Sequence, residues 1–320
     1  MNVLAQLQSL RLPVIAAPMF ILSNPKMVIE QCKAGIVGAF PALNARGEGV
    51  FEQWLIEITE ALDAHNQANP DNPAAPFAVN QIVFKTNTRL QQDIELCVKY
   101  KVPLTITSLG AVAEVNDAAH SYGGLVFHDV INQKFARKAI EKGADGLITV
   151  AAGAGGHAGE QSPFALVQET REWFDGPLAL SGCIATGSSV LAARAMGADF
   201  GYVGSAFIAT KEANADQAYK QMVVDSHADD IVYSNYFSGV HGNYLKPSIA
   251  NAGLNPNDLP DADPSNMLSF AEDKPDAKAW KDIWGCGQGI GAVKEILTVS
   301  ERVEKLANEY QAAKKKLLAE

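Results

Sequence analysis

Eight short apolar segments, separated by stretches with helical periodicity, constrain the fold more than any other feature of the chain. They read as near-continuous apolar runs, which is typical of strands in a parallel sheet that is buried on both faces. The intervals carry amphipathic patterns such as 51-FEQWLIEITEALDAH and 133-QKFARKAIEKG. An α/β fold, a (β/α)8 TIM barrel, is therefore predicted. The eight segments are 13-PVIAAPM, 35-GIVGAF, 77-FAVNQI, 103-PLTITSL, 125-LVFHDV, 146-GLITVA, 177-PLALSG and 200-FGYVGS.

The alternation of predicted strands and helices contains a repeated motif, and it ends before the C-terminal third of the chain. The pattern AxxxGAD occurs at residues 139–145 and 193–199, and it predicts a helix-to-strand hinge in which glycine takes the left-handed position after the helix. After Thr210 the strand-helix alternation stops, and residues 255–266 are rich in Asn, Asp and Pro. A helical pattern returns after Cys286. We therefore predict a barrel built from residues 1–210 and 285–320. Residues 211–284 would form a lid-like extension between strand eight and the last barrel helix.

Composition and charge exclude several classes of function. The 320 residues are 48% hydrophobic and 19% charged, as in soluble globular proteins. A net charge of −10 argues against nucleic acid or an anionic membrane surface as a partner. The four cysteines lie far apart without a CxxC pair, so neither a metal site nor a disulfide framework is expected. No apolar run reaches membrane-spanning length and no leader pattern is present, which favours a cytoplasmic location.

Two loops at the predicted strand ends are candidates for phosphate binding. In TIM barrels the active site lies at the carboxyl ends of the strands, and phosphate usually sits after strands seven and eight. These loops are 181-SGCIATG-187 and 204-GSAF-207, which combine glycine with small hydroxyl side chains. Either glycine could simply make a tight turn. Two such loops at both expected positions favour a phosphorylated cofactor or substrate. The candidate residues are Ser181, Gly182, Cys183, Gly204 and Ser205.

Residues at the ends of three other predicted strands could also contact a ligand. Asn80 ends the third strand, where the alternative is a turn-forming role. His128 and Asp129 end the fifth, where a structural hydrogen-bonded pair is an equal alternative to a ligand contact. At the first strand, Ala17, Pro18 and Met19 form a small apolar rim against which a flat aromatic ring could lie.

The sixth strand runs into the glycine loop 153-GAGGHAG-159, which carries one ionisable side chain, His157. The loop fits the dinucleotide fingerprint GxGxxA, but the next strand ends in Ser181 and Gly182 instead of the acidic residue that binds a ribose. It also follows the sixth strand and not the first strand of a Rossmann unit. We therefore reject dinucleotide binding here. A purely structural role for His157, bracing the loop through backbone hydrogen bonds, is the alternative to catalysis.

Together these motifs resemble the nitronate monooxygenase family, formerly called 2-nitropropane dioxygenases. The shared segments are 15-IAAPM, 79-VN, 153-GAGGHAG, 181-SG, 195-AMGADFGYVGSAFIAT and 284-WGCGQG, which span most of the chain. The resemblance implies an FMN-binding barrel that oxidises alkyl nitronates, and in some cases nitroalkanes, with O2 to a carbonyl compound and nitrite. It implies His157 as the catalytic residue. The implied FMN contacts are Ala17, Pro18, Met19, Asn80, Gly156, Ser181, Gly182, Gly204 and Ser205. His128 and Cys183 at the strand ends, and Gln288 in the loop returning to the barrel, are further candidates for contact with the cofactor.

The resemblance explains why a single imidazole stands in a glycine loop. Glycines let the backbone pass close to the planar flavin ring and leave open volume beside it. An imidazole in that volume can hold a nitronate oxygen or take a proton from a neutral nitroalkane. The extension, with Tyr233, Tyr236, His241 and Tyr244, is expected to cover the flavin. Related flavoproteins often carry a lysine at the end of strand five, where this chain has Asp129.

Three other functions remain open from the sequence. The same fold and flavin serve NAD(P)H:quinone reductases and enoyl reductases. A non-redox barrel that binds a phosphorylated metabolite, or a binding protein without turnover, would also fit the strand-end loops. The expected partners are a small-molecule nitronate and O2. The oligomeric state is open, a homo-oligomer included.

Overall fold

A computed structural model describes residues 2–84, 86–262 and 282–319. Eight parallel strands follow one another around a sheet in the order β1-β9-β8-β6-β5-β4-β3-β2. The two edge strands meet at an Ile15–Val37 bridge, where the Ala16 N–H donates to the Val37 carbonyl at 2.8 Å. This closes the sheet, and the predicted TIM barrel is confirmed. The strands are β1 (Val14–Ala16), β2 (Gly38–Pro41), β3 (Phe77–Ile82), β4 (Leu104–Ser108), β5 (Leu125–Val130), β6 (Gly146–Val150), β8 (Leu178–Ser181) and β9 (Phe200–Val203).

The barrel interior explains why the strands are mostly apolar. Leu7, Ile106, Phe127 and Ile148 belong to one buried cluster inside the barrel, and Leu7 comes from α1 (Val3–Gln8) at one end of it. The opposite faces of the strands pack under the surrounding helices, so β4 is buried at every position. Both faces are therefore buried, which favours apolar side chains, although β4 places the small polar residues Thr105 and Thr107 beside Leu104 and Ile106.

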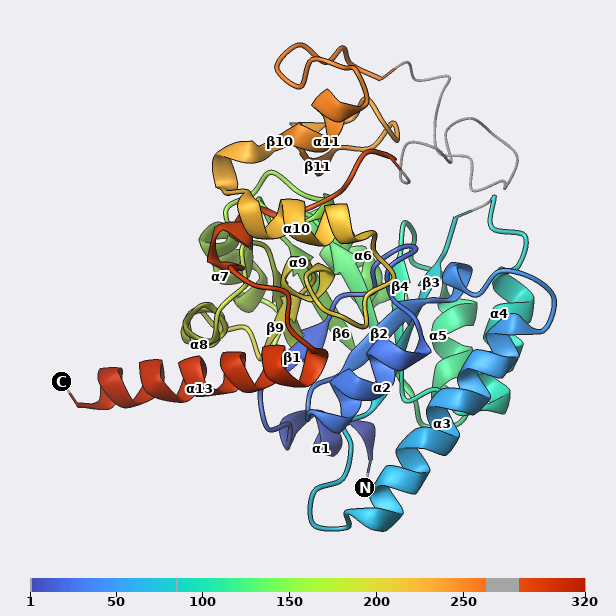
Figure 1. The fold of residues 1–320 in the computed structure, drawn as a ribbon. Coiled ribbons are helices and arrows are strands. Elements are labelled where there is room, and N and C mark those ends of the chain that lie inside the picture. The colour runs from blue at the N-terminus through green and yellow to red at the C-terminus, as the bar shows by residue number, and fades with distance from the viewer. Residues whose placement is uncertain (1, 85, 263–281, 320) are drawn as a thin grey trace.

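The helices surround the barrel, as Figure 1 shows. One follows each strand. The N-cap of the first is Asn24, whose side chain accepts from the Met27 N–H at 3.1 Å. Within the described residues, no helix is both long and apolar enough to cross a membrane. The surrounding helices are α2 (Pro25–Lys33), α3 (Val50–Ala68), α4 (Leu90–Lys99), α5 (Ala113–His120), α6 (Gln133–Glu141), α7 (Pro163–Arg171), α8 (Gly187–Ala195) and α13 (Val299–Leu318).

The repeated GAD motif forms the predicted hinge twice. Gly143 and Gly197 follow α6 and α8 with φ angles of 96° and 114°, the left-handed region that glycine enters without steric cost. The acidic residue then ties neighbouring strands together. Asp145 accepts from the Val126 N–H at 2.7 Å. Asp199 likewise accepts from the N–H of Leu178, the first residue of β8, at 2.8 Å. The motif thus sets the register of two strand pairs.

After β9 the chain leaves the barrel pattern. A second sheet forms in the order β10-β11-β7, and its third strand, β7 (Gly156–His157), belongs to the glycine loop. Figure 1 places β10, β11 and α11 together above the barrel. Residues 263–281 of the extension lie outside the described residues. The elements of this region are α9 (Ser205–Ile208), α10 (Gln217–Asp225), η2 (Ala228–Asp230), β10 (Ile231–Ser234), β11 (Gly242–Leu245), α11 (Lys246–Asn251) and η5 (Gln288–Ala292).

The C-terminal helix α13 occupies the position of the eighth barrel helix. It packs against α8 and α2. The Gly187 N–H at the start of α8 donates to the Glu309 carboxylate at 2.9 Å. A Cβ atom at Gly187 would lie only 2.1 Å from the Leu306 carbonyl oxygen and 2.2 Å from the Tyr310 nitrogen. The two helices therefore approach closely because residue 187 has no side chain.

This contact generates a stability prediction. Gly187→Ala should lower the free energy of unfolding by about 1–3 kcal/mol, the range typical of overpacking, because the new methyl group meets backbone atoms that cannot rotate away. Ser188→Ala, at the exposed neighbouring position, is the matched control and should change stability little. Urea denaturation of the two variants would measure the difference. Equal stability of the two variants would show that α13 does not pack this closely in solution.

Candidate active site

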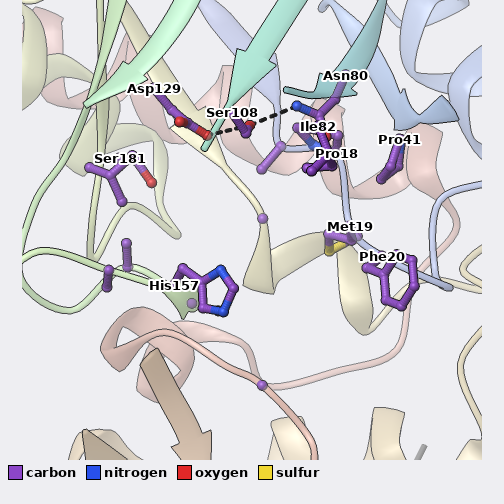
Figure 2. Close-up of a pocket in the computed structure, with 18 of the residues that line it drawn as sticks. Pro18, Met19, Phe20, Pro41, Asn80, Ile82, Ser108, Asp129, His157 and Ser181 are labelled. Atoms are coloured by element: carbon purple, nitrogen blue, oxygen red, sulfur yellow. Dashed lines mark hydrogen bonds between the residues drawn. The ribbon is translucent and has the colours of Figure 1, made fainter. Parts of the chain in front are cut away.

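A cavity opens where the barrel strands end. Its volume is about 2510 Å³, larger than the roughly 300–1,000 Å³ of a typical small-molecule pocket. The ends of the strands form one wall, the glycine loop forms another, and residues of the extension, including Tyr236 and Phe237, form a third. Figure 2 shows His157 on the side of the cavity opposite Asp129 and Asn80. The space is sufficient for a cofactor together with a second molecule.

Nearly all residues predicted for the site line this cavity. Gln288 is the exception: its backbone N–H donates to the Gly153 carbonyl at 2.9 Å, and its side-chain oxygen lies 4.0 Å from the sulfur of Cys183. Gln288 is exposed and contacts two residues of the cavity wall, and its predicted contact with a cofactor remains a prediction. The predicted residues on the wall are Ala17, Pro18, Met19, Asn80, His128, Gly156, His157, Ser181, Gly182, Cys183, Gly204 and Ser205.

The two loops predicted to bind phosphate are tightly packed and offer little side-chain bulk. A Cβ atom at Gly182 would lie 2.9 Å from the Ala152 carbonyl oxygen, and one at Gly204 would lie 3.3 Å from the Cβ of Ala17. Ser205 accepts a hydrogen bond from the Gly287 N–H at 2.8 Å, which joins the second loop to the returning chain. These loops therefore present mainly backbone to the cavity, which suits the close approach of a phosphate or a flat ring.

A directed chain of hydrogen bonds crosses the strand ends, drawn as dashed lines in Figure 2. The Asn80 amide donates to the Ser108 hydroxyl at 2.8 Å, and Ser108 in turn donates to the Asp129 carboxylate at 2.5 Å. Burial raises the pKa of Asp129 to about 6, against the opposing effect of the Ser108 hydrogen bond. Burial, followed by the Asp129 charge, raises the pKa of Tyr202 on β9. Asp129 therefore titrates close to neutral pH.

His128 does not pair with its neighbour Asp129. Its Nδ1 lies 2.6 Å from the hydroxyl of Thr107 on β4. Burial, followed by the positive charge of Lys138, lowers the pKa of His128 to about 4. His128 and Asp129 thus each form a hydrogen bond with the neighbouring strand β4. They do not form the structural pair with each other that the sequence left open.

The glycine loop that carries His157 is held by the extension. Residues 156–157 pair with 243–242 of β11 in antiparallel register. The Asn243 amide donates to the Ala154 carbonyl at 2.7 Å, and the Tyr233 hydroxyl donates to the Ala158 carbonyl at 2.8 Å. Tyr236 lines the cavity, whereas Tyr244 is buried. The loop is thus fixed on both sides of His157 by residues that lie far along the chain.

The immediate partner of His157 determines which ring nitrogen carries the proton. Its Nε2 lies 3.1 Å from the Ser238 oxygen, and the Ser238 hydroxyl donates to the Val240 carbonyl at 2.9 Å. With the Ser238 hydrogen on the Val240 carbonyl, Nε2–H is the donor to Ser238 and Nδ1 is the acceptor nitrogen of the neutral ring. Burial lowers the pKa of His157 to about 4. The imidazole is therefore neutral at physiological pH.

Two further residues of the site, Ser108 and Ser238, were not predicted from the sequence. Ser108 ends β4, so the strand-end rule that identified Asn80 could also have found it. Ser238 lies 81 residues from its partner His157, in the loop between two strands of the extension. No local pattern indicates that pairing, because it depends on how the extension folds back onto the barrel.

The fold and cavity define a small-molecule enzyme built on a TIM barrel. Residues 2–309 match the family model for nitronate monooxygenase, and the chain belongs to this family of oxidoreductases. It is 25% identical to a probable nitronate monooxygenase of Bacillus subtilis over 97% of this chain and 99% of that one. It is also 25% identical to a putative monooxygenase of Mycobacterium tuberculosis, where the match covers 68% of this chain and 61% of the relative.

A solved structure shows a closely similar fold. The nitroalkane oxidase from Streptomyces ansochromogenes superimposes with a TM-score of 0.79 at 21% identity, covering 98% of this chain and 99% of the other. At this level of identity the likeness concerns the arrangement of the barrel and the elements that follow it. The chemistry of the present site must be argued from its own residues.

The environment of His157 generates a prediction about its titration. In the protein without ligand, nuclear magnetic resonance of the ring nitrogens should show a neutral His157 with Nε2 protonated down to about pH 5. In the unfolded chain the ring has its ordinary pKa of about 6.5. Between about pH 6.5 and 4 the unfolded chain therefore binds more protons than the folded protein, so lowering the pH through this window reduces the stability of the folded state. Ser238→Ala should shift the ring toward a mixture of tautomers. A wild-type His157 that titrates near its ordinary value would contradict this description.

Proposed function

We propose that the protein is an FMN-dependent nitronate monooxygenase that oxidises alkyl nitronates, and nitroalkanes after loss of a proton, with O2 to a carbonyl compound and nitrite. The observation that carries the proposal is a neutral imidazole, His157, oriented by Ser238 and by strand pairing in a glycine-lined cavity at the strand ends. Membership of the nitronate monooxygenase family supports it.

The cavity residues fit a flavin mononucleotide. A Cβ atom at Gly156 would meet nothing within 4 Å, so the loop borders open space where a planar ring can lie. Ala17, Pro18 and Met19 supply an apolar surface for that ring. Residues 181–183 and 204–205 would hold a single phosphate. When bound, FMN supplies the redox chemistry, and the protein supplies position and electrostatics.

His157 acts as a base or as an anchor for an anion. In the tautomer set by Ser238, Nδ1 is the acceptor, which suits removal of a proton from a neutral nitroalkane. A bound nitronate carries negative charge, which raises the pKa of a nearby imidazole by favouring its protonated form. A protonated ring can then donate to a nitronate oxygen. The same residue thus serves both substrates through opposite protonation states.

The extension would act as a lid. Tyr236, Phe237 and Trp284 reach the cavity from residues 211–284, and β11 is joined to the His157 loop by backbone pairing. Covering the cavity in this way would exclude water from the oxidation and strengthen electrostatic contacts with the substrate. We propose this lid as the second structural unit of the protein, beside the FMN-binding barrel.

The cofactor proposal predicts a yellow protein with non-covalent FMN. Gly204→Ala and Gly204→Val should lower flavin occupancy progressively, since the added methyl groups fill the space that the phosphate needs. This glycine is better suited than Gly182, which has a φ of 129° and would be strained by any side chain. Chromatography of heat-released flavin would measure occupancy. Recovery of FAD, or no flavin after reconstitution, would refute the assignment.

The catalytic proposal predicts a selective loss in His157→Ala. FMN should remain bound, whereas turnover of a neutral nitroalkane should fall by on the order of 10²–10⁴-fold if His157 is the base. Turnover of the already ionised nitronate should fall less. If His157 only orients an anion, both substrates should lose activity to a similar, smaller extent. His120→Ala, at the exposed His120–Asp145 pair on α5, is the control and should retain full turnover.

The reductase alternatives are separated by a second assay on the wild-type protein. A nitronate monooxygenase should form nitrite from a nitronate and should react negligibly with NADH in the absence of oxygen. A quinone or enoyl reductase should show rapid bleaching of its flavin by NADH or NADPH. Rapid bleaching together with no nitrite would overturn the proposed reaction while leaving the fold and the flavin intact.

A further inference from the structure

The floor of the cavity carries an acid that the proposed reaction does not use. Asp129 ends β5, lines the cavity and receives the Ser108 hydrogen bond at 2.5 Å. Ser108 cannot turn away, because the Asn80 amide donates to its oxygen and leaves its hydrogen directed to Asp129. Asn80 itself is buried and also donates to the Ile106 carbonyl at 3.1 Å. The carboxyl is therefore held in one orientation by two neighbouring strands.

Among the described residues, the Asp129 carboxyl forms no ion pair with a cation. By comparison Asp93, another buried carboxyl, lies 3.1 Å from the guanidinium of Arg89. An unpaired carboxylate that lines an apolar cavity is disfavoured, and one proton removes the charge.

The other titratable groups around the cavity floor keep a constant charge between pH 5 and 8. His128 on the same strand and His157 on β7 both have a pKa lowered to about 4 by burial, so both are neutral. Tyr202 on β9 has its pKa raised well above its ordinary value by burial, so it also stays neutral. Lys138 on α6, whose charge acts on His128, also lines the cavity. Among the described acid–base groups named here, Asp129 is therefore the one whose charge changes in this window.

We propose that Asp129 is a second acid–base group of the active site, one that holds an exchangeable proton toward the bound flavin. The exchange is a simple ionisation in which the carboxyl releases a proton to solvent and keeps the electron pair as carboxylate. The protonated form can donate a hydrogen bond into the cavity, whereas the carboxylate repels negative charge there. This inference rests on the proposed flavin site, and it assigns to Asp129 a task separate from that of His157.

The test is a pH titration of the visible absorbance of the flavin-loaded protein. The wild type should show one spectral transition between pH 5 and 8, with a midpoint near 6. Asp129→Asn should abolish it, because the amide has the shape of the protonated acid and cannot ionise. Asp93→Asn is the matched control at a buried carboxyl that does not line the cavity, and it should leave the transition unchanged.

Ser108→Ala supplies a directional test that does not depend on the folding of Asp129→Asn. Ser108 stabilises the carboxylate by donating to it, so its removal should move the midpoint upward by roughly one to two pH units. A loss of general packing would not move the midpoint in a defined direction. A wild-type spectrum independent of pH, a transition that persists in Asp129→Asn, or an unmoved midpoint in Ser108→Ala would overturn the proposal.

Flavin-free protein separates failure of this inference from failure of the proposed function. The folded pKa of Asp129 lies above the unfolded value of about 3.9, so the wild type loses stability as pH rises from about 4 to 6. The melting temperature of Asp129→Asn should therefore increase relative to that of the wild type between about pH 4 and 6. The difference between the two should then stay constant at higher pH. If the protein takes up no flavin, the proposed function fails while this comparison still reports the ionisation of Asp129.

Discussion

The pairing of β7 with β11 is the interaction on which the candidate site depends. A loop composed mainly of glycine cannot fix its own position, because it has no side chains to pack and pays a large entropic cost to become ordered. Backbone hydrogen bonds to β11 replace the missing packing. A Cβ atom at Gly242 would lie 2.7 Å from the Gly156 carbonyl oxygen, so this approach also requires glycine on the partner strand. The position of His157 is consequently determined by the extension and not by the barrel alone.

A single physical cause, burial in the cavity, acts oppositely on the two acid–base groups. Loss of hydration disfavours the charged form of each group, which lowers the pKa of His157 to about 4 and raises that of Asp129 to about 6. Near neutral pH His157 is therefore uncharged, whereas Asp129 is mostly ionised and becomes neutral only below about pH 6. Because the cavity is poorly hydrated, the charge state of Asp129 acts strongly on any ring or anion placed beside it. Separation of two titrating groups by their surroundings is a recurring way to assign different roles within one site.

The sequence predicted those parts of the structure that follow from local periodicity and from the geometry of parallel sheets. The eight strands and the GAD hinges repeat a local pattern, and the strand-end rule brought Asn80, Ser181 and Gly204 to one cavity. Contacts made by the irregular extension could not be predicted. The strand character of Gly156–His157, the Ser238 partner and the contact of Gln288 with Gly153 all depend on long-range packing. No periodic pattern encodes such packing.

The division between barrel and extension explains how the fold persists while the site can change. The strand ends hold their side chains in a fixed register, so an arrangement with a TM-score of 0.79 to the nitroalkane oxidase survives at 21% identity. Within that frame a single replacement at a strand end alters the charge that a cofactor meets. Asp129 is such a position, because its neighbours Ser108 and Asn80 orient whatever polar group stands there. In the proposed function, substrate contacts come instead from the His157 loop and the extension. Under that proposal, changes on one side of the cavity adjust the cofactor without disturbing the residue that meets the substrate.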